Sequence, residues 1–247
     1  VAVRHEAMGG GDSATVGMLT SLYALNDHWA LRGQYGTAYK LPNAEQLFVN
    51  EPGHEIGNRN LKPEKSRNAE LGIDYKGLLG ERDFSASVTL FKRKITDLIT
   101  LDDVQWVNGQ GQLQMRGFEA DAKLALNDQW SLQADMTRNL TESRTGVTLN
   151  DIPSFFARSR IGFESENRLW GAGTAIRYIR DITSSKNVEY GHYSVVDADA
   201  YRYLDAAHQH RLSLLVENLF DRDYVTSRAS NVDNLGRPFT SEVRYTY

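Results

Sequence analysis

The sequence has no cysteine and no long apolar run. Its 247 residues carry a formal charge of -4 at pH 7 and a mean hydropathy of -0.50. The absence of cysteine is compatible with an oxidising compartment, where a free thiol is a hazard. The weakly acidic balance does not indicate a nucleic-acid partner. No window reaches the roughly 18 to 20 apolar residues that a membrane-spanning helix needs, so a helical membrane protein is not indicated.

Enzyme motifs are also lacking. The sequence contains no GxSxG nucleophile elbow, no HExxH zinc motif and no P-loop. Gly109 and Gly111 are turn residues of a long loop. His208 and His210 are either a metal pair or ordinary solvated histidines of a turn. We therefore predict that the protein is not an enzyme and has no catalytic residue, no resident metal and no cofactor.

What the sequence does contain is alternation of apolar and polar residues with a period of two, the pattern of half-buried strands. A transmembrane barrel strand has only about 10 residues and turns half of them away from lipid, so low hydropathy does not exclude a membrane. The alternative is a soluble β-sandwich with one buried face. The alternating segments are 29–39, 69–75, 84–90, 118–126, 130–136, 157–163, 170–178, 211–217 and 239–247, with weaker patterns at 15–25 and 193–204.

Two features favour the membrane barrel over the sandwich. Connections alternate between short ones, such as 26–28 and 127–129, and long ones, such as 40–65 and 94–113. Outer-membrane barrels have short turns at one rim and long loops at the other, as well as aromatic girdles at both rims. Aromatic residues do lie at the predicted strand ends: Trp29, Tyr39, Tyr75, Trp130, Trp170, Tyr178, Tyr245 and Tyr247.

A long polar loop between Tyr39 and Tyr75 carries the most specific motifs. It contains YKLP and GNRNLKPE and is followed by NAELGIDY. The prolines Pro42 and Pro63 force extended geometry on Leu41 and Lys62, which ends the flanking strands. This arrangement resembles the barrel domain of TonB-dependent outer-membrane receptors, in which a Pro-containing box and a GNxxLKPE box flank one extracellular loop.

The C-terminal segment strengthens the resemblance. VENLFDRDY, a long loop, GRPF and SEVRYTY are similar to the closing pattern of the family, and the terminal strand ends on Tyr247. An aromatic last residue resembles the signal read by the outer-membrane assembly machinery. In physical terms, Asn218, Asp221 and Arg222 are also ordinary residues of a turn.

The predicted fold class is all-β, an antiparallel transmembrane β-barrel. About 12 strands are expected here, whereas the resemblance implies 22 in the family, preceded by a plug domain. We therefore assign residues 1–247 to the C-terminal part of the barrel domain, with the plug absent from this chain. Val1 begins within a strand-like segment without a leader peptide, which predicts a mature or truncated piece. A smaller, closed barrel is the alternative, because an open half-barrel would leave two unpaired edges in lipid.

The resemblance implies an active-transport receptor that imports an iron complex, either a siderophore or haem, or another metal-bearing ligand. Its implied partners are the TonB complex, outer-membrane lipid and lipopolysaccharide, and the assembly machinery; no nucleic acid is expected. The second hypothesis is a passive, porin-like diffusion channel, and the third is an outer-membrane barrel enzyme. Loop chemistry of this kind serves siderophores, haem, cobalamin and metals alike.

Two sets of residues are candidates for the site. In the first, His54 lies between the two boxes with Glu51 and Glu55 nearby, where an imidazole could meet haem iron or a metal, although a surface histidine is the alternative. The loop aromatics Trp106, Phe155, Phe156 and Tyr190 would either contact a ligand or pack the loops.

The second set is ionic. Because charge on the lipid side costs about 2–4 kcal/mol near the midplane, we predict that these residues face the lumen or plug: Arg32, Glu70, Asp74, Glu119, Asp121, Arg158, Arg160, Arg177, Glu242 and Arg244.

Overall fold

The computed structural model describes residues 1–7, 13–109, 111–143, 152–182, 191–229 and 232–247. Over these residues the main sheet has twelve antiparallel strands, each paired with its neighbours in chain order, as the sequence predicts. The strands are β1 (Ala2–Ala7), β2 (Ser13–Ala24), β3 (Trp29–Lys40), β6 (Glu64–Leu79), β7 (Arg82–Thr96), β10 (Gln112–Ala125), β11 (Trp130–Ser143), β12 (Phe155–Glu164), β13 (Trp170–Arg180), β14 (Tyr193–Tyr203), β15 (Arg211–Glu217) and β18 (Thr240–Thr246).

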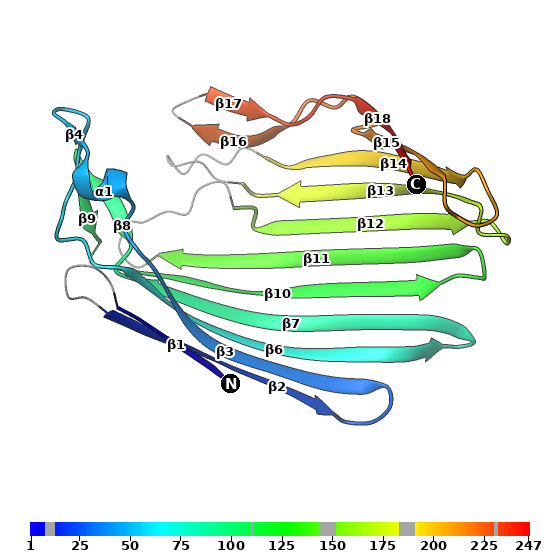
Figure 1. Cartoon of the computed structure of the whole chain (residues 1–247), viewed down its shortest axis with the longest axis horizontal. Helices are drawn as coiled ribbons and strands as arrows, with labels where there is room; N and C mark the ends of the chain where they lie inside the picture. Colours follow the sequence, from blue (N-terminus) through cyan, green and yellow to red (C-terminus); the bar gives the residue numbers. More distant parts are fainter. Residues whose placement is uncertain (8–12, 110, 144–151, 183–190, 230–231) are drawn as a thin grey trace.

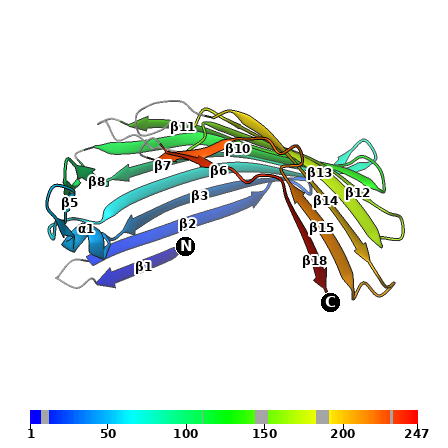
Figure 2. The same ribbon diagram turned by 90° about the horizontal axis from the view of Figure 1, so that it is seen from above.

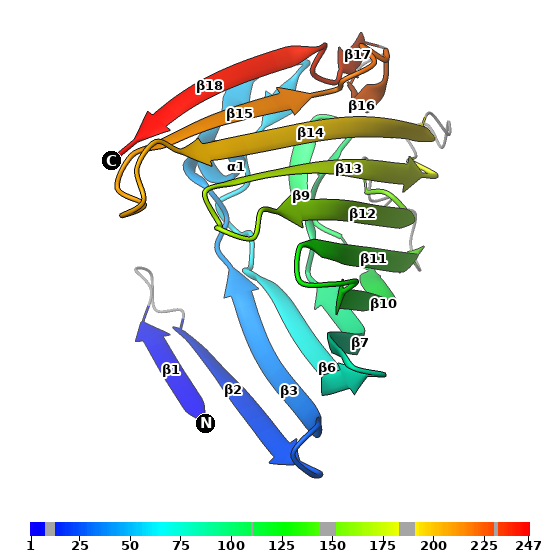
Figure 3. The same cartoon turned by 90° about the vertical axis from the view of Figure 1, so that its right-hand side faces the viewer.

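The sheet is strongly curved. Figure 3 shows the sheet as an open arc, with β1 at one edge and β18 at the other. A continuous antiparallel sheet bent in this way is one wall of a barrel. Within the part of the chain that the structure covers, no helix has the length and apolar character needed to cross a bilayer as a helix.

The connections sort by length at the two ends of the strands, as predicted. One end carries short turns, the tightest being Gly80-Glu81, where Gly80 has φ of +65°. The other end carries the long loops with all the minor elements (Figures 1 and 2). These are α1 (Ala44–Phe48), β4 (Asn50–Glu51), β5 (Glu55–Ile56), β8 (Ile99–Asp102) and β9 (Gln105–Asn108), together with the hairpin of β16 (Val225–Ala229) and β17 (Val232–Leu235).

The strand register sorts side chains onto two faces of the main sheet. Directly opposed residues share a face, and one such row is Leu31, Ile73, Val88, Ala120 and Met136. We call this side the apolar face. Its large side chains are exposed, and the exposed fraction is 59% for Leu71, 37% for Leu132, 46% for Ile176 and 69% for Val243. Apolar residues thus point outward rather than into a dry centre, as the barrel prediction requires.

The opposite side, the ionic face, carries the predicted charged residues. The four buried hydrophobic residues in the described part of the main-sheet strands also lie on it: Leu113, Ala175, Tyr193 and Val195. Side chains converge on the inner side of a curved sheet and diverge on its outer side. The ionic face is therefore the inner, concave side of the arc.

An aromatic row crosses the apolar face at the end with the short turns. Trp29 contacts Tyr75 with ring centroids 4.8 Å apart, and Tyr75 contacts Phe84 at 5.7 Å. On the other half of the sheet, Phe163 bridges Trp130 and Trp170 at 5.0 and 4.8 Å. Amphipathic and large aromatic rings at one level of an outward face are typical of a membrane interface.

Candidate functional site

The long loops between β3 and β6 and between β7 and β10 are joined into one layer, which we call the loop layer (residues 41–63 and 97–109). β4, β5, β9 and β8 form a small sheet that both loops share, and β5 pairs with β9 in parallel. The Ile56 amide donates to the Val104 carbonyl at 2.6 Å. Because the pairing joins two loops far apart in sequence, it is a tertiary contact that local patterns cannot indicate.

The short helix α1 begins at a capping box. The Asn43 side chain accepts from the Gln46 amide at 2.8 Å, and the Gln46 side chain accepts from the Asn43 amide at 2.9 Å. Such reciprocal capping stabilises a helix too short to persist alone. The Asn58 amide then donates to the Gln46 carbonyl at 2.9 Å, so the helix is tied to the GNRNLKPE segment.

The GNRNLKPE segment holds the loop layer together. Asn58 donates from Nδ2 to the Trp106 carbonyl at 3.0 Å. The Lys62 amide donates to Asn108 Oδ1 at 2.7 Å, and Asn108 Nδ2 donates back to the Lys62 carbonyl at 2.8 Å. Glu64 accepts the Ile99 amide at 3.0 Å. Asn58 and Glu64 of this motif therefore satisfy backbone groups of the neighbouring loop, whose Asn108 satisfies the backbone of Lys62, and Leu61 of the motif is buried.

Gly57, the first residue of that segment, allows a close backbone approach. A Cβ at this position would lie 2.7 Å from the Leu47 carbonyl carbon and 2.7 Å from the Phe48 nitrogen. The Gly57 amide also donates to the Val49 carbonyl at 2.7 Å. Only glycine fits where the segment passes this near the end of α1.

His54 lies at the tip of the β4–β5 hairpin. Its amide donates to the Glu51 carbonyl at 2.9 Å, and its side chain and that of Glu51 are exposed, while Glu55 is half-buried opposite Glu51. Within the described ranges, no group of three or more His, Cys, Asp or Glu residues could hold a metal ion. The three predicted residues are therefore neighbours on one hairpin, without a preformed metal cluster around them.

The predicted loop aromatics separate into different environments. Trp106 lies half-buried in β9 of the loop layer, and its Nε1 is buried without a hydrogen-bond partner. Phe155 and Phe156 are not loop residues, because β12 begins at Phe155. Phe155 is on the apolar face, edge-on to Tyr178 at 6.1 Å, whereas Phe156 is on the ionic face. Tyr190 lies outside the described residues.

A third loop, after β15, is anchored over the ionic face by Asn218. This residue is buried and has φ of +52°, in the left-handed region. Its Nδ2 donates to the Arg222 and Arg237 carbonyls, and its Oδ1 accepts the Arg222 amide. Its own amide donates to Asp197 at 3.0 Å. Tyr224 from the same loop packs against Tyr193 with tilted rings whose centroids are 4.4 Å apart, and it closes a cluster with Ile182 and Val195.

Arginine–aspartate pairs cross the strands of the ionic face. Arg177 donates to Asp197 at 2.7 and 3.1 Å, and Arg160 forks onto Asp199 at 2.9 and 3.0 Å. On β3, Arg32 binds Asp74 at 2.6 and 2.8 Å. Such two-pronged contacts fix the arginine heads in place. Asp197 and Asp199 were not predicted from the sequence.

Several other charges on this face lie beside like charges or lack an ion pair. Asp121 lies directly opposite Asp135, which in turn lies opposite Arg158. In the described part of the chain Arg158 makes no ion pair, and its other neighbour is Arg177. Glu70 and Glu119 lie on the same face, as do Glu242 and Arg244, which pair with each other at 2.7 Å on the edge strand β18. The inner wall thus offers both signs of charge to whatever lies against it.

Comparison with known proteins decides the family. A family model described as "TonB dependent receptor-like, beta-barrel" matches residues 4–219, most of the chain. The chain belongs to the TonB-dependent receptor family. The resemblance carried by the boxes at 39–42 and 57–64 is thereby confirmed.

Solved structures of TonB-dependent receptors share this fold. The copper transporter OprC matches with a TM-score of 0.73 and 20% identity over 94% of this chain and 39% of its own. The ferric-catecholate import receptor Fiu of E. coli K12 gives 0.72 and 19% over 94% and 34%. The Serratia marcescens hemophore receptor HasR, solved with its hemophore HasA and heme, gives 0.73 and 19% over 94% and 39%. The chain therefore spans less than half the length of each of these receptors.

The sequence boxes that resemble those of the TonB-dependent receptors have a structural role in this chain. In this chain the GNRNLKPE box binds one loop to another through backbone hydrogen bonds and a buried leucine, and it presents no cluster of ligating side chains. The box at residues 218–220 (NLF) acts similarly at the third loop, where Asn218 holds the chain in a left-handed turn. Both boxes are architectural in this structure.

Proposed function

We propose that this chain is the C-terminal part of an outer-membrane receptor that binds and imports an iron complex, a siderophore or haem, or another metal-bearing ligand, with energy supplied through TonB. Family membership supports active transport across the outer membrane. The similar structures include a copper transporter, a ferric-catecholate import receptor and a hemophore receptor solved with heme, which supports a metal-bearing cargo without selecting one. The observation that carries the proposal is the concave ionic face beneath anchored loops.

The whole barrel, on this proposal, has 22 strands and encloses a plug that is not part of residues 1–247. The curved sheet supports this, because β1 and β18 are its edges and unpaired edge strands are not viable in lipid. Twelve strands then form one wall, and the remaining strands complete the ring. The ionic face would line the lumen.

The ionic face is suited to contact a plug that must be released. Arg158 and the opposed Asp121 and Asp135 retain charge that their own sheet does not neutralise. Polar and charged groups from a plug would pair with them, and such contacts can be exchanged for water when the plug moves. A passive channel would instead leave this wall in contact with bulk solution.

Ligand contact is proposed at the loop layer, where Glu51, His54 and Glu55 are presented on the β4–β5 hairpin and Trp106 lies beside it. If the cargo is haem, the exposed imidazole of His54 is the axial ligand that the hairpin offers. Titration of haem into the full-length protein would then give a Soret shift that His54→Ala removes. An unchanged spectrum in that variant would leave His54 as a surface residue.

Lipid, including lipopolysaccharide, is the proposed partner of the apolar face. The assembly machinery is the proposed partner of β18, where Val243 and Tyr245 point outward and Tyr247 follows at the end. An edge strand with outward-facing aromatic residues offers both unpaired backbone groups and apolar contacts to an assembly factor.

Uptake and conductance together test the proposal. Cells carrying the full-length protein should accumulate radiolabelled iron from its chelate, and loss of TonB or collapse of the proton gradient should abolish accumulation. The same protein in a planar bilayer should be nearly silent, because a plug closes it. Steady ion conductance with uptake that is independent of TonB would show a passive channel instead.

A further inference from the structure

A cluster of cations lies on the apolar face, at the end with the long loops. Strands β6, β7 and β10 turn it outward, in register with the leucines below. We call it the rim patch, and it consists of Lys65, Arg67, Lys92, Lys94 and Arg116. Charge on this side of a barrel is costly at the membrane midplane and tolerated only near the interfaces. The position of five cations on the lipid-facing side of the rim therefore calls for an interaction that stabilises them there.

Like charges are directly opposed within the rim patch. Arg67 lies opposite Lys94, and Lys92 lies opposite Arg116. Directly opposed like charges on antiparallel strands are destabilising. On the ionic face Arg32, Arg160 and Arg177 are paired with aspartates, whereas within the described residues Lys65, Arg67, Lys92 and Lys94 have no ion pair or side-chain hydrogen bond. At these four positions the sheet gathers positive charge without an ion pair of its own.

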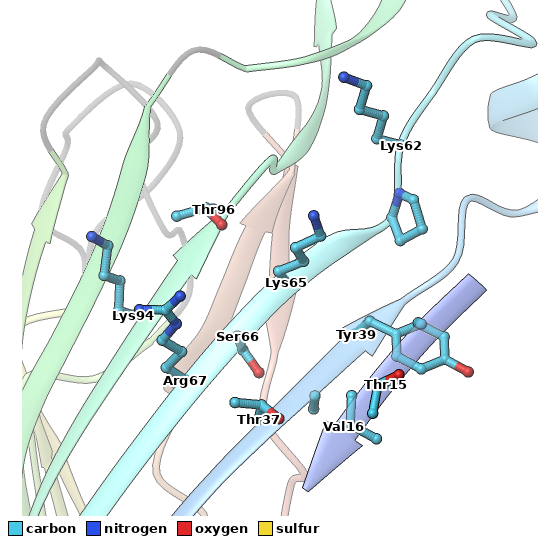
Figure 4. Close-up of a pocket in the computed structure, with 13 residues that line it drawn as sticks. Thr15, Val16, Thr37, Tyr39, Lys62, Lys65, Ser66, Arg67, Lys94 and Thr96 are labelled. Atoms are coloured by element: carbon cyan, nitrogen blue, oxygen red, sulfur yellow. The ribbon is translucent and has the colours of Figure 1, made fainter. Parts of the chain in front are cut away.

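A cavity of about 560 Å³ opens beside three of these cations. Figure 4 shows Lys65 and Arg67 on one strand and Lys94 on the next, with Lys62 above them. The other polar lining is hydroxyl-bearing: Thr15, Thr37, Tyr39, Ser66 and Thr96. No carboxylate lines the cavity among the residues that the structure describes. Ammonium, guanidinium and hydroxyl donors without an acidic group form a lining suited to phosphate.

The height of the rim patch matches the lipid headgroups. Arg67 lies eight residues from Tyr75 along β6, and Lys92 lies eight residues from Phe84 along β7. Eight residues of strand span about 26 Å. At a tilt of about 40° this is a height of about 20 Å, close to the apolar band of about 25 Å in outer-membrane barrels. With the aromatic row at one interface, the cations lie at the other.

We propose that the rim patch is a docking site for a multiply phosphorylated lipid headgroup of the outer leaflet, that of lipopolysaccharide, whose phosphates lie between Arg67 and Lys94 and reach Lys92 and Lys65. The proposal rests on the outer-membrane location proposed above, and it is independent of which ligand is transported. A headgroup fits better than a soluble polyanion because the cations point sideways from the barrel, directly above exposed Leu71 and Leu90.

Binding of lipopolysaccharide to the full-length protein in zwitterionic micelles tests the proposal. Each cation near a charged lipid surface contributes about 1 kcal/mol, or about fivefold in affinity. The triple variant Arg67→Gln, Lys92→Gln, Lys94→Gln should therefore bind about 100-fold more weakly. Dephosphorylated lipopolysaccharide should bind the wild type as weakly as intact lipopolysaccharide binds the triple variant.

Arg93→Gln is the matched control. Arg93 lies between Lys92 and Lys94 in the same strand at the same height, but it points to the ionic face and donates to Asn68 at 2.9 Å. This variant should bind lipopolysaccharide like the wild type. A charge-keeping variant, Arg67→Lys with Lys92→Arg and Lys94→Arg, should also retain binding and shows that the barrel assembles when all three positions are changed.

Three results would overturn the proposal. The first is equal affinity of the wild type and the triple glutamine variant for lipopolysaccharide, and the second is equal loss in the charge-keeping variant. The third is displacement of the lipid by inorganic phosphate at the same phosphorus concentration, which would make the patch a site for free phosphate. Lipid binding without iron uptake would contradict only the proposed transport, and uptake without lipid binding would contradict only the rim patch.

Discussion

At the scale of single residues, the family motif acts through backbone geometry. Gly57 allows the GNRNLKPE segment to pass the end of α1, and Asn58 and Asn108 satisfy the backbone of the facing loop. Unsatisfied backbone groups in such a layer would each cost about 1–3 kcal/mol. A motif can therefore identify a family because of the loop fold that it holds, without touching a ligand.

Gly57→Ala should disrupt the loop layer. The added Cβ would lie 2.7 Å from two backbone atoms of α1, and backbone cannot move aside as a flexible side chain can. We expect a loss of about 1–3 kcal/mol, the usual cost of overpacking, seen as faster hydrogen exchange of the Ile56 and Asn58 amides. Gly109→Ala is the control, since its Cβ would meet atoms only at 3.6 and 3.7 Å. Equal exchange in both variants would contradict the steric role of Gly57.

Asn218 has a left-handed backbone conformation and a full set of side-chain hydrogen bonds. Two substitutions distinguish the contributions of these features to stability. Asn218→Gly keeps the left-handed turn but loses the three side-chain bonds to Arg222 and Arg237, whereas Asn218→Ala loses both. Alanine should therefore be more destabilising than glycine, by about 1 kcal/mol. Urea unfolding of the barrel in micelles measures the difference. If glycine is as harmful as alanine, the backbone conformation is not what asparagine supplies.

At the scale of elements, a period of two predicts strand positions and faces together. In β6 and β7 it places Leu71 and Leu90 on one side and Asp74 and Thr89 on the other, and the register agrees. The pattern is ambiguous in β14, because Val195 and Val196 make both faces apolar. Asp197 and Asp199, the acidic partners of two predicted arginines, were missed for that reason.

The minor elements could not be predicted from the sequence. β5 and β9 are stabilised by each other across two loops, with Ile56 beside Gln105, so neither segment carries a signal by itself. α1 has a capping box at Asn43 and Gln46 that could have been noticed, but its five residues are too few to show an apolar stripe. Likewise, the alternation in β12 could have placed Phe155 on a strand, since Phe155 continues its apolar face, whereas Phe156 lies on the ionic face and breaks the pattern.

The facing of β12 can be tested directly. Cysteines replacing Ala157 and Ile161 on the apolar face should react with a membrane-soluble maleimide in the assembled protein. Cysteines replacing Arg158 and Arg160 should resist it and react only with a water-soluble reagent that enters the lumen. Labelling followed by mass spectrometry measures both sets. The reverse pattern would place the charged residues in lipid and would contradict the barrel.

At the scale of the whole molecule, the sheet pairs several arginines with aspartates on one face and gathers cations at the rim of the other. Inside, Arg32, Arg160 and Arg177 each bind an aspartate across the strands. Outside, Arg67 lies opposite Lys94, and Lys92 lies opposite Arg116. The inner pairs stabilise the wall itself, whereas Lys65, Arg67, Lys92 and Lys94 have no ion pair within the described residues and would gain stability from an anion that arrives from the membrane.

This asymmetry predicts opposite effects of one substitution on stability and on lipid binding. Arg67→Glu replaces a repulsive pair with an attractive one, because residue 67 lies opposite Lys94. In lipid-free micelles the variant should be more stable by about 0.2–1 kcal/mol, measured by urea unfolding. With lipopolysaccharide present the order should reverse, because the phosphates stabilise the wild type and are repelled by the new carboxylate. A variant that is less stable in both conditions would show that Arg67 supports the fold itself and would remove the reason for assigning it to lipid.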